Sequence, residues 1–125
     1  MKHPEDFMVY SKEPHNIYFK FNDAKVEDEG ILKMDMLIMQ LKKVRNAKLV
    51  MYGYTDSVGA NDYNLKLAAR RIDSVKKILV QSGVITENNI LIETKILGEH
   101  DPLLSYHTIN NDPHSRRVEI YITSV

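Results

Sequence analysis

The chain has 125 residues, with 17 Lys and Arg against 17 Asp and Glu, 43% hydrophobic residues and no cysteine. A chain of this length can fold around one core without disulfides or metal, and it leaves no room for a second full domain. The balanced charge argues against nucleic-acid binding, which leaves a basic excess in a sequence. The absence of cysteine excludes a disulfide framework, a thiolate metal site and a thiol nucleophile.

No apolar run approaches the ~18 residues of a membrane span, and no signal-peptide core follows the first residues. The sequence is therefore interpreted as a cytosolic protein or as a piece of a longer exported chain. Residues 1–16 hold two prolines, two histidines and several charges without a sustained period. We interpret them as a leader or linker, with order beginning near His15. Residues 17–22 alternate apolar with polar positions, which predicts a strand with one buried face and a turn at Asn22 and Asp23.

Residues 27–44 carry apolar side chains at three- and four-residue spacing, which predicts a helix with a core-facing stripe of Ile31, Met34, Ile38 and Leu41. Cationic residues near position 42–45 suit the C-terminal end of that helix. Residues 48–54 are apolar at both alternating positions, so we predict a strand that is covered on both faces and lies centrally in a sheet.

After a loop at 56–60, a second helical stripe predicts a helix ended by Gly83; its apolar positions are Leu65, Ala68, Ile72, Val75 and Leu79. Residues 90–97 and 117–123 predict the third and fourth strands. The stretch 98–116 is long for a connection, and such loops tend to be functional or to contain a short helix.

This order predicts an α+β fold, a two-layer sandwich of topology β-α-β-α-β-β with a mixed four-stranded sheet and its helices on one face. Right-handed crossovers would make the first three strands parallel. The last strand is free to insert antiparallel.

The candidate site follows the central strand, where Asp56 stands at the strand end and beside the start of the next helix. Ligands of open α/β sheets favour this position. Asn64 and Arg71 are seven residues apart and so share one side of that helix, at the rim of the apolar stripe. Asp56 and Arg71 could together hold a zwitterion, the carboxylate taking an ammonium and the guanidinium a carboxylate. The alternative is that Asp56 caps a turn and Arg71 is a solvated or salt-bridged surface residue.

Four ordered segments carry a family resemblance: GYTDSVG at 53–59, YNL at 63–65, RR at 70–71 and SRRVEI at 115–120. Together with the opening strand around Phe19 and Phe21, they resemble the OmpA C-terminal-like peptidoglycan-binding domain, which includes domains of OmpA, the peptidoglycan-associated lipoprotein and MotB. The resemblance runs from about residue 17 to 123, so we assign residues 17–125 to such a domain.

The resemblance implies noncovalent binding of the peptide stem of peptidoglycan, with its diaminopimelate held by Asp56 and Arg71. It implies supporting roles in the ligand site for Thr55, Asn64, Arg116 and Arg117. A family member of this kind would anchor an outer-membrane or envelope protein to the cell wall from the periplasm, and the signal and other domains of that protein would lie outside this chain. It would need no cofactor or metal, would bind no nucleic acid and would not itself insert into a membrane. A homodimer is left open.

Several positions depart from the family pattern. Tyr54 stands at the motif histidine, Ala68 at its serine, Ile72 at the alanine after the arginine, and Ser115 at the asparagine before the arginine pair, while Lys20 and Asn22 stand where acids are common. These departures bear on affinity and on the preferred stem residue, and they motivate a second hypothesis: a structural or interaction domain that has lost its ligand.

Other features have simple interpretations. His100, His107 and His114 recur every seven residues, but Pro102 and Pro113 exclude one continuous helix, so we predict no metal site there. The methionines are interpreted as core filler. No serine has a histidine at a motif spacing and no phosphate loop is present, so we predict that the protein is not an enzyme.

Overall fold

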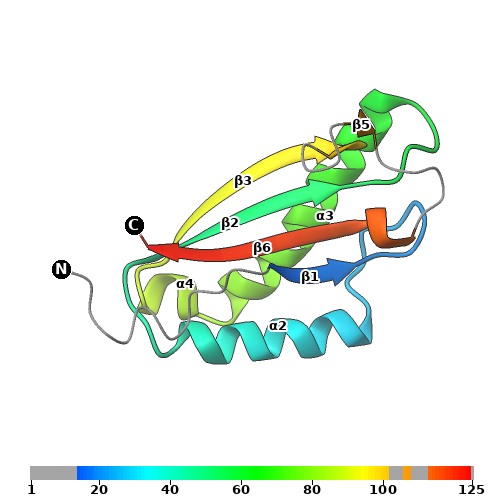
Figure 1. Ribbon diagram of the computed structural model, residues 1–125. Helices are drawn as coiled ribbons and strands as arrows, with labels where there is room; N and C mark the ends of the chain where they lie inside the picture. The colour runs from blue at the N-terminus through cyan, green and yellow to red at the C-terminus, as the bar shows by residue number, and fades with distance from the viewer. Residues whose placement is uncertain (1–13, 102–105, 108–112, 125) are drawn as a thin grey trace.

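The computed structural model describes residues 14–101, 106–107 and 113–124 (Figure 1). In chain order its elements are β1 (His15–Tyr18), α2 (Asp28–Leu41), β2 (Ala47–Tyr54), α3 (Asn61–Gln81), α4 (Val84–Glu87), β3 (Leu91–Gly98), β4 (His100–Asp101), β5 (Tyr106–His107), the 3₁₀ helix η1 (Pro113–Ser115) and β6 (Arg117–Ser124).

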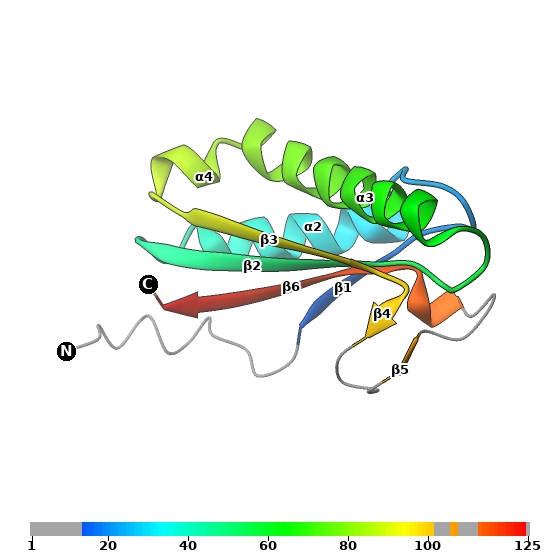
Figure 2. The ribbon, with the colours of Figure 1, turned by 90° about the horizontal axis from the view of Figure 1, so that it is seen from above.

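The main sheet has the order β1-β6-β2-β3, with β6 antiparallel to both of its neighbours and β2 parallel to β3. The helices α2, α3 and α4 cover one face, and the small β4–β5 ladder lies on the other side of the sheet (Figure 2). The predicted fold is confirmed, including the antiparallel insertion of the last strand. None of the helices in the described ranges is long and apolar enough to cross a membrane.

The first strand differs most from its prediction. It starts at His15, inside the expected leader, and ends at Tyr18 instead of Asn22. The chain turns there, because the Asp23 N–H donates to the Lys20 carbonyl (3.1 Å) and Asn22 adopts a φ of 57°. The remainder of the expected leader, residues 1–13, lies outside the described residues. The long connection 98–116 contains a short helix, η1, which is one of the two alternatives that its length suggested.

Helix α2 buries Gly30, Met34, Leu37, Ile38 and Leu41. The expectation that Ile31 belongs to the core is wrong, since its side chain is exposed. Gly30 is the buried residue of that turn, and an added Cβ would come within 3.2 Å of Ile17 Cγ2, so the helix backbone lies directly against β1.

The methionines divide into two groups. Met34 and Met51 are fully buried, as expected of core filler. Met36 and Met39 are each 63% exposed, so the core assignment is wrong for them. Both lie at the surface of α2, and Met36 lines a hollow beside His15 and Asn16 of β1.

Strand β2 is an interior strand and is buried at most of its positions, which confirms the prediction for 48–54. Gly53 allows α3 to approach its end closely: a Cβ there would lie 2.8 Å from the Ala68 carbonyl oxygen and 2.9 Å from Ile72 Cδ1. Helix α3 is therefore held against the carboxyl end of β2, where Asp56 follows.

Candidate functional site

A small pocket lies where β2 runs into the loop before α3. Its lining comes from that loop, from the N-terminal half of α3, from the turn after β1 and from the residue before β6: Phe21, Asn22, Thr55, Asp56, Val58, Tyr63, Asn64, Leu67, Arg71 and Arg116. Five of the six residues that the sequence proposes for the site are among them. The cavity measures about 20 Å³, which is room for about one water molecule.

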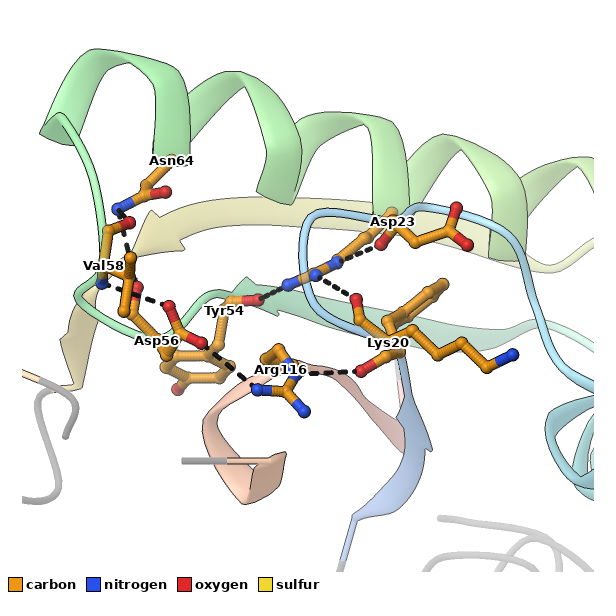
Figure 3. A network of polar contacts seen from close by, with 9 residues as sticks. Lys20, Asp23, Tyr54, Asp56, Val58, Asn64 and Arg116 are labelled. Atoms are coloured by element: carbon orange, nitrogen blue, oxygen red, sulfur yellow. Dashed lines mark hydrogen bonds and ion pairs between the residues drawn. The ribbon is translucent and has the colours of Figure 1, made fainter. Parts of the chain in front are cut away.

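Asp56 is almost completely buried, with 3% of its surface exposed. Its Oδ1 accepts a hydrogen bond from the Val58 N–H (3.1 Å), which closes a turn of the kind that Asp commonly stabilises. Its Oδ2 forms an ion pair with Arg116 Nη1 at 3.3 Å (Figure 3). Each carboxylate oxygen accepts one of these bonds, so each retains capacity for a further donor.

Arg71 is fully buried, and its guanidinium donates to three backbone carbonyls. Nε donates to Asp23 (2.8 Å), Nη1 to Tyr54 (3.1 Å) and Nη2 to Lys20 (3.1 Å). A guanidinium has five N–H groups, so two remain beyond these bonds. Arg71 thereby ties the turn after β1 to the end of β2, and the rim position expected from the helical stripe is wrong.

Burial lowers the pKa of Arg71 to about 10, while the carboxylate of Asp56 acts in the opposite direction. Arg71 therefore remains cationic at neutral pH. Its guanidinium carbon also lies 5.2 Å from the centre of the Phe19 ring, within the range of a cation–π contact.

Asn64 and Thr55 support the loop. The Asn64 amide donates to the Val58 carbonyl (3.1 Å) and, at 3.5 Å, to the Asp56 carbonyl, so both of its N–H groups are directed at the loop (Figure 3). The Thr55 N–H donates to the Gly98 carbonyl at 2.7 Å, which joins the loop to the end of β3.

The adjacent arginines Arg116 and Arg117 point to different places. Arg116 lies at the pocket, where its Nε also donates to the Phe19 carbonyl at 3.2 Å. Arg117 pairs with Glu119 at 2.8 Å and stacks over the Tyr54 ring, with its guanidinium carbon 4.0 Å from the ring centre. Val118 is in the core on the helix side, so the alternation of the strand places Arg117 on the opposite face.

Two of the residues that depart from the family pattern, Tyr54 and Lys20, direct their side chains away from the pocket. Tyr54 offers its carbonyl to Arg71 and its ring to Arg117, so its side chain is directed away from the pocket. The Lys20 ammonium pairs with Glu27 at 3.2 Å instead of entering the pocket. Its positive charge is thus compensated outside the site.

The mouth of the pocket was not anticipated from the sequence. Phe21 and Tyr63 line it and are 53% and 42% exposed, and the Tyr63 hydroxyl donates to Asn22 Oδ1. This bond links the turn after β1 to the first turn of α3. The tyrosine before Asn64 in the YN pair is a sequence signal that could have indicated it.

Chemically, the pocket brings one acid and two arginines together without pairing Asp56 to Arg71. Asp56 is partnered by Arg116, and Arg71 by carbonyl oxygens. Such a site can offer a negative group and a separate positive group to one ligand. Within the described ranges no group of three His, Asp or Glu side chains could hold a metal ion.

Comparisons with known proteins agree on the fold. The structure matches the peptidoglycan-associated lipoprotein of Burkholderia pseudomallei with a TM-score of 0.66 and 20% identity, over 87% of this chain and 90% of that one. It matches the cell wall anchor of the T6SS from Pseudomonas aeruginosa with a TM-score of 0.61 and 21% identity, over 88% and 80% of the two chains.

The sequence comparisons identify the family. Outer membrane protein A of Bordetella avium is 36% identical over 105 residues, which are 84% of this chain and 53% of that protein. This chain thus spans about half the length of these curated relatives. The family model described as the OmpA family matches residues 18–116, which include β2, β3 and both long helices and end just before β6. The chain belongs to the OmpA family.

Proposed function

We propose that this chain binds the peptide stem of peptidoglycan noncovalently and holds its diaminopimelate between Asp56 and Arg71. The observation that carries the proposal is the burial of an acid and an arginine, each with remaining hydrogen-bonding capacity, at one pocket beside the end of β2. The names of a peptidoglycan-associated lipoprotein and of a cell wall anchor among its structural neighbours support it.

In this proposal Asp56 accepts hydrogen bonds from the ligand ammonium through the free capacity of its two oxygens. Arg71 donates its two remaining N–H groups to the ligand carboxylate, and its charge is intact at neutral pH. Arg116 fixes the Asp56 carboxylate in place. Asn64 and Thr55 hold the loop that presents Asp56.

Binding requires the pocket to open, because a cavity of about 20 Å³ is too small for an amino acid and Arg71 is fully buried. The turn 20–23 is the segment that must move. It is joined to α3 by the Tyr63–Asn22 bond and is held underneath by Arg71. The ligand would bind an open state better than the closed one and shift the equilibrium between them.

At the level of the cell, we propose a periplasmic anchor that ties an outer-membrane or envelope protein to the wall. The chain spans about half of its curated relatives, so the partner domain belongs to the rest of such a protein. The proposed binding involves no covalent step and no cofactor.

A second candidate is a structural domain without this ligand. The three carbonyl bonds of Arg71 favour it, since they give the buried guanidinium a role in the fold alone. The two candidates differ in what the pocket binds.

Titration of the protein with meso-diaminopimelate, followed by amide NMR, tests the proposal. We expect shifts at residues 55–58 and 20–23, where the pocket must open. 1,5-Diaminopentane is the matched control ligand, because it keeps the carbon chain and both amino groups of diaminopimelate and lacks both carboxylates. It should bind at least about tenfold more weakly, since it offers no carboxylate to the Arg71 guanidinium. Equal affinity for the two ligands, or no binding of either, would favour the structural domain.

A further inference from the structure

A groove runs along the outer edge of β1, between this strand and α2. One part of it has a volume of about 370 Å³, lined by residues of β1, α2 and η1: Tyr18, Phe19, Lys20, Glu27, Glu29, Gly30, Lys33, His114 and Arg116. A second part, of about 310 Å³, continues along the start of the strand, past Pro14, His15, Asn16, Met36 and Gln40. Tyr18 and Lys33 line both parts, so we treat them as one β1–α2 groove.

The strand edge that borders this groove is unpaired in the main sheet, where β1 is the outermost strand. The Phe19 N–H donates to the Arg116 carbonyl, so by antiparallel alternation Phe19 and Ile17 face β6. The backbone N–H and C=O groups of Asn16 and Tyr18 then point away from β6, toward the groove. The Asn16 carbonyl accepts a hydrogen bond there from Lys33 Nζ of α2 at 3.1 Å. Such an edge is a template for an extended peptide.

Two residues that line the groove carry a buried polar atom, His15 Nε2 and Asn16 Oδ1, that has no hydrogen-bond partner among the described residues. Lys33 Nζ lies 5.0 Å from the centre of the Tyr18 ring, and it pairs with no carboxylate of the described residues. Buried polar groups are normally satisfied, and a cation without an acid suits a ligand carboxylate.

The groove meets the diaminopimelate pocket at Arg116, which lines both. Nη1 of Arg116 faces Asp56 and its Nε faces the Phe19 carbonyl (Figure 3), while Nη2 makes no hydrogen bond or ion pair with the described residues. A peptide whose diamino acid sits in the pocket must continue out of it.

We propose that the β1–α2 groove binds the rest of the same peptide stem, as an extended chain along β1 with one of its carboxylates between Lys33 and Arg116. This inference rests on the proposed function, since it places the stem by its diaminopimelate. It adds the direction of the stem and names Lys33 as a specificity-determining residue that the diaminopimelate pocket itself does not contain.

Calorimetric titration with two probes tests the proposal. Free meso-diaminopimelate reaches only the pocket, whereas L-alanyl-γ-D-glutamyl-meso-diaminopimelate carries an additional free carboxylate on its glutamyl residue. We expect the tripeptide to bind the parent protein about tenfold more tightly than the free diamino acid, and Lys33→Gln to remove most of that gain while leaving the affinity for diaminopimelate unchanged. Lys33→Arg keeps the charge and should retain the gain.

Lys25→Gln is the matched control, because Lys25 is exposed on the neighbouring loop and lines neither pocket nor groove. It should bind both probes like the parent. A tripeptide affinity that Lys33→Gln changes by less than about twofold, or that equals the affinity for diaminopimelate, would overturn the groove assignment and leave the pocket intact. Failure of the parent to bind either probe would overturn the proposed function and, with it, this inference.

Discussion

The two faces of the sheet use neighbouring arginines for different purposes. On the helix-covered side, Arg71 and Arg116 surround Asp56 and line a pocket. On the opposite side, Arg117 is paired with Glu119 and stacked on Tyr54. Both ion pairs are nearly buried: the side chains of Arg116 and Asp56 are 13% and 5% exposed, and those of Arg117 and Glu119 are 12% and 7% exposed.

The two ion pairs differ in the hydrogen bonds that each carboxylate accepts and in what borders it. Glu119 accepts two bonds from Arg117 on one oxygen, and its other oxygen accepts a bond from the Tyr121 hydroxyl at 3.4 Å. Asp56 accepts one bond on each oxygen and borders a cavity. A similar degree of burial therefore accompanies two different arrangements, and only the Asp56 pair lines the pocket to which we assign the proposed ligand.

The largest effect is expected from Arg71→Met. The variant keeps the apolar stem but leaves the carbonyls of Lys20, Asp23 and Tyr54 without their donor. We expect a loss of about 3 kcal/mol or more in the free energy of unfolding, or about 10 °C in Tm, together with loss of binding. Thermal and urea denaturation measure the stability. The neighbouring Arg70 is exposed, so Arg70→Met should change it little. Equal effects of the two substitutions would contradict a structural role for Arg71.

Asp56→Asn tests the role of the negative charge in the pocket. The amide oxygen can still accept from the Val58 N–H, so the turn is retained, but the charge that meets the ligand ammonium is lost. We expect an affinity loss of about 2 to 4 kcal/mol, roughly 30-fold to 1000-fold, in co-sedimentation with sacculi. Asp62→Asn, in the exposed first turn of α3, is the control. Sedimentation of Asp56→Asn at the parental level would place the ligand elsewhere.

The substitutions Arg116→Gln and Arg117→Gln compare the two faces of the sheet most directly. Each removes one nearly buried ion pair, so both should lower stability by a similar amount, about 1 to 3 kcal/mol. Only Arg116→Gln should also weaken diaminopimelate binding, by about tenfold, because it releases the Asp56 carboxylate. Parallel denaturation and calorimetry separate the two readouts. A binding defect of the same size in Arg117→Gln would restore Arg117 to the ligand site.

The smallest effect is expected from Tyr63→Phe, which removes the bond to Asn22 across the pocket mouth and keeps the ring. A lost hydrogen bond of about 1 kcal/mol should favour the open state and raise ligand affinity by up to about fivefold. Tyr52→Phe, on the opposite face, is the control and should not alter affinity. Weaker binding by Tyr63→Phe would instead mean that its hydroxyl contacts the ligand.

Periodicity in the sequence was sufficient to predict both long helices, the central strand and the last strand, because burial leaves a repeat of two or 3.6 residues. It failed at Ile31 and at Met36 and Met39, which are apolar and exposed. It also misplaced the end of β1, since the turn is fixed by the Asp23–Lys20 bond and by Arg71 from α3.

By itself, the sequence determined the topology and, through its motif spacing, that Asp56, Asn64 and Arg71 lie at one end of the sheet. Only the tertiary structure decided which groups pair there. Arg71, 15 residues along the chain from Asp56, donates to three backbone carbonyls, and Arg116, 60 residues away, forms the ion pair with Asp56. Hydrogen-bond partners depend on distances of a few tenths of an ångström between separate elements, and those distances are set by packing of the core, for example by α3 against Gly53.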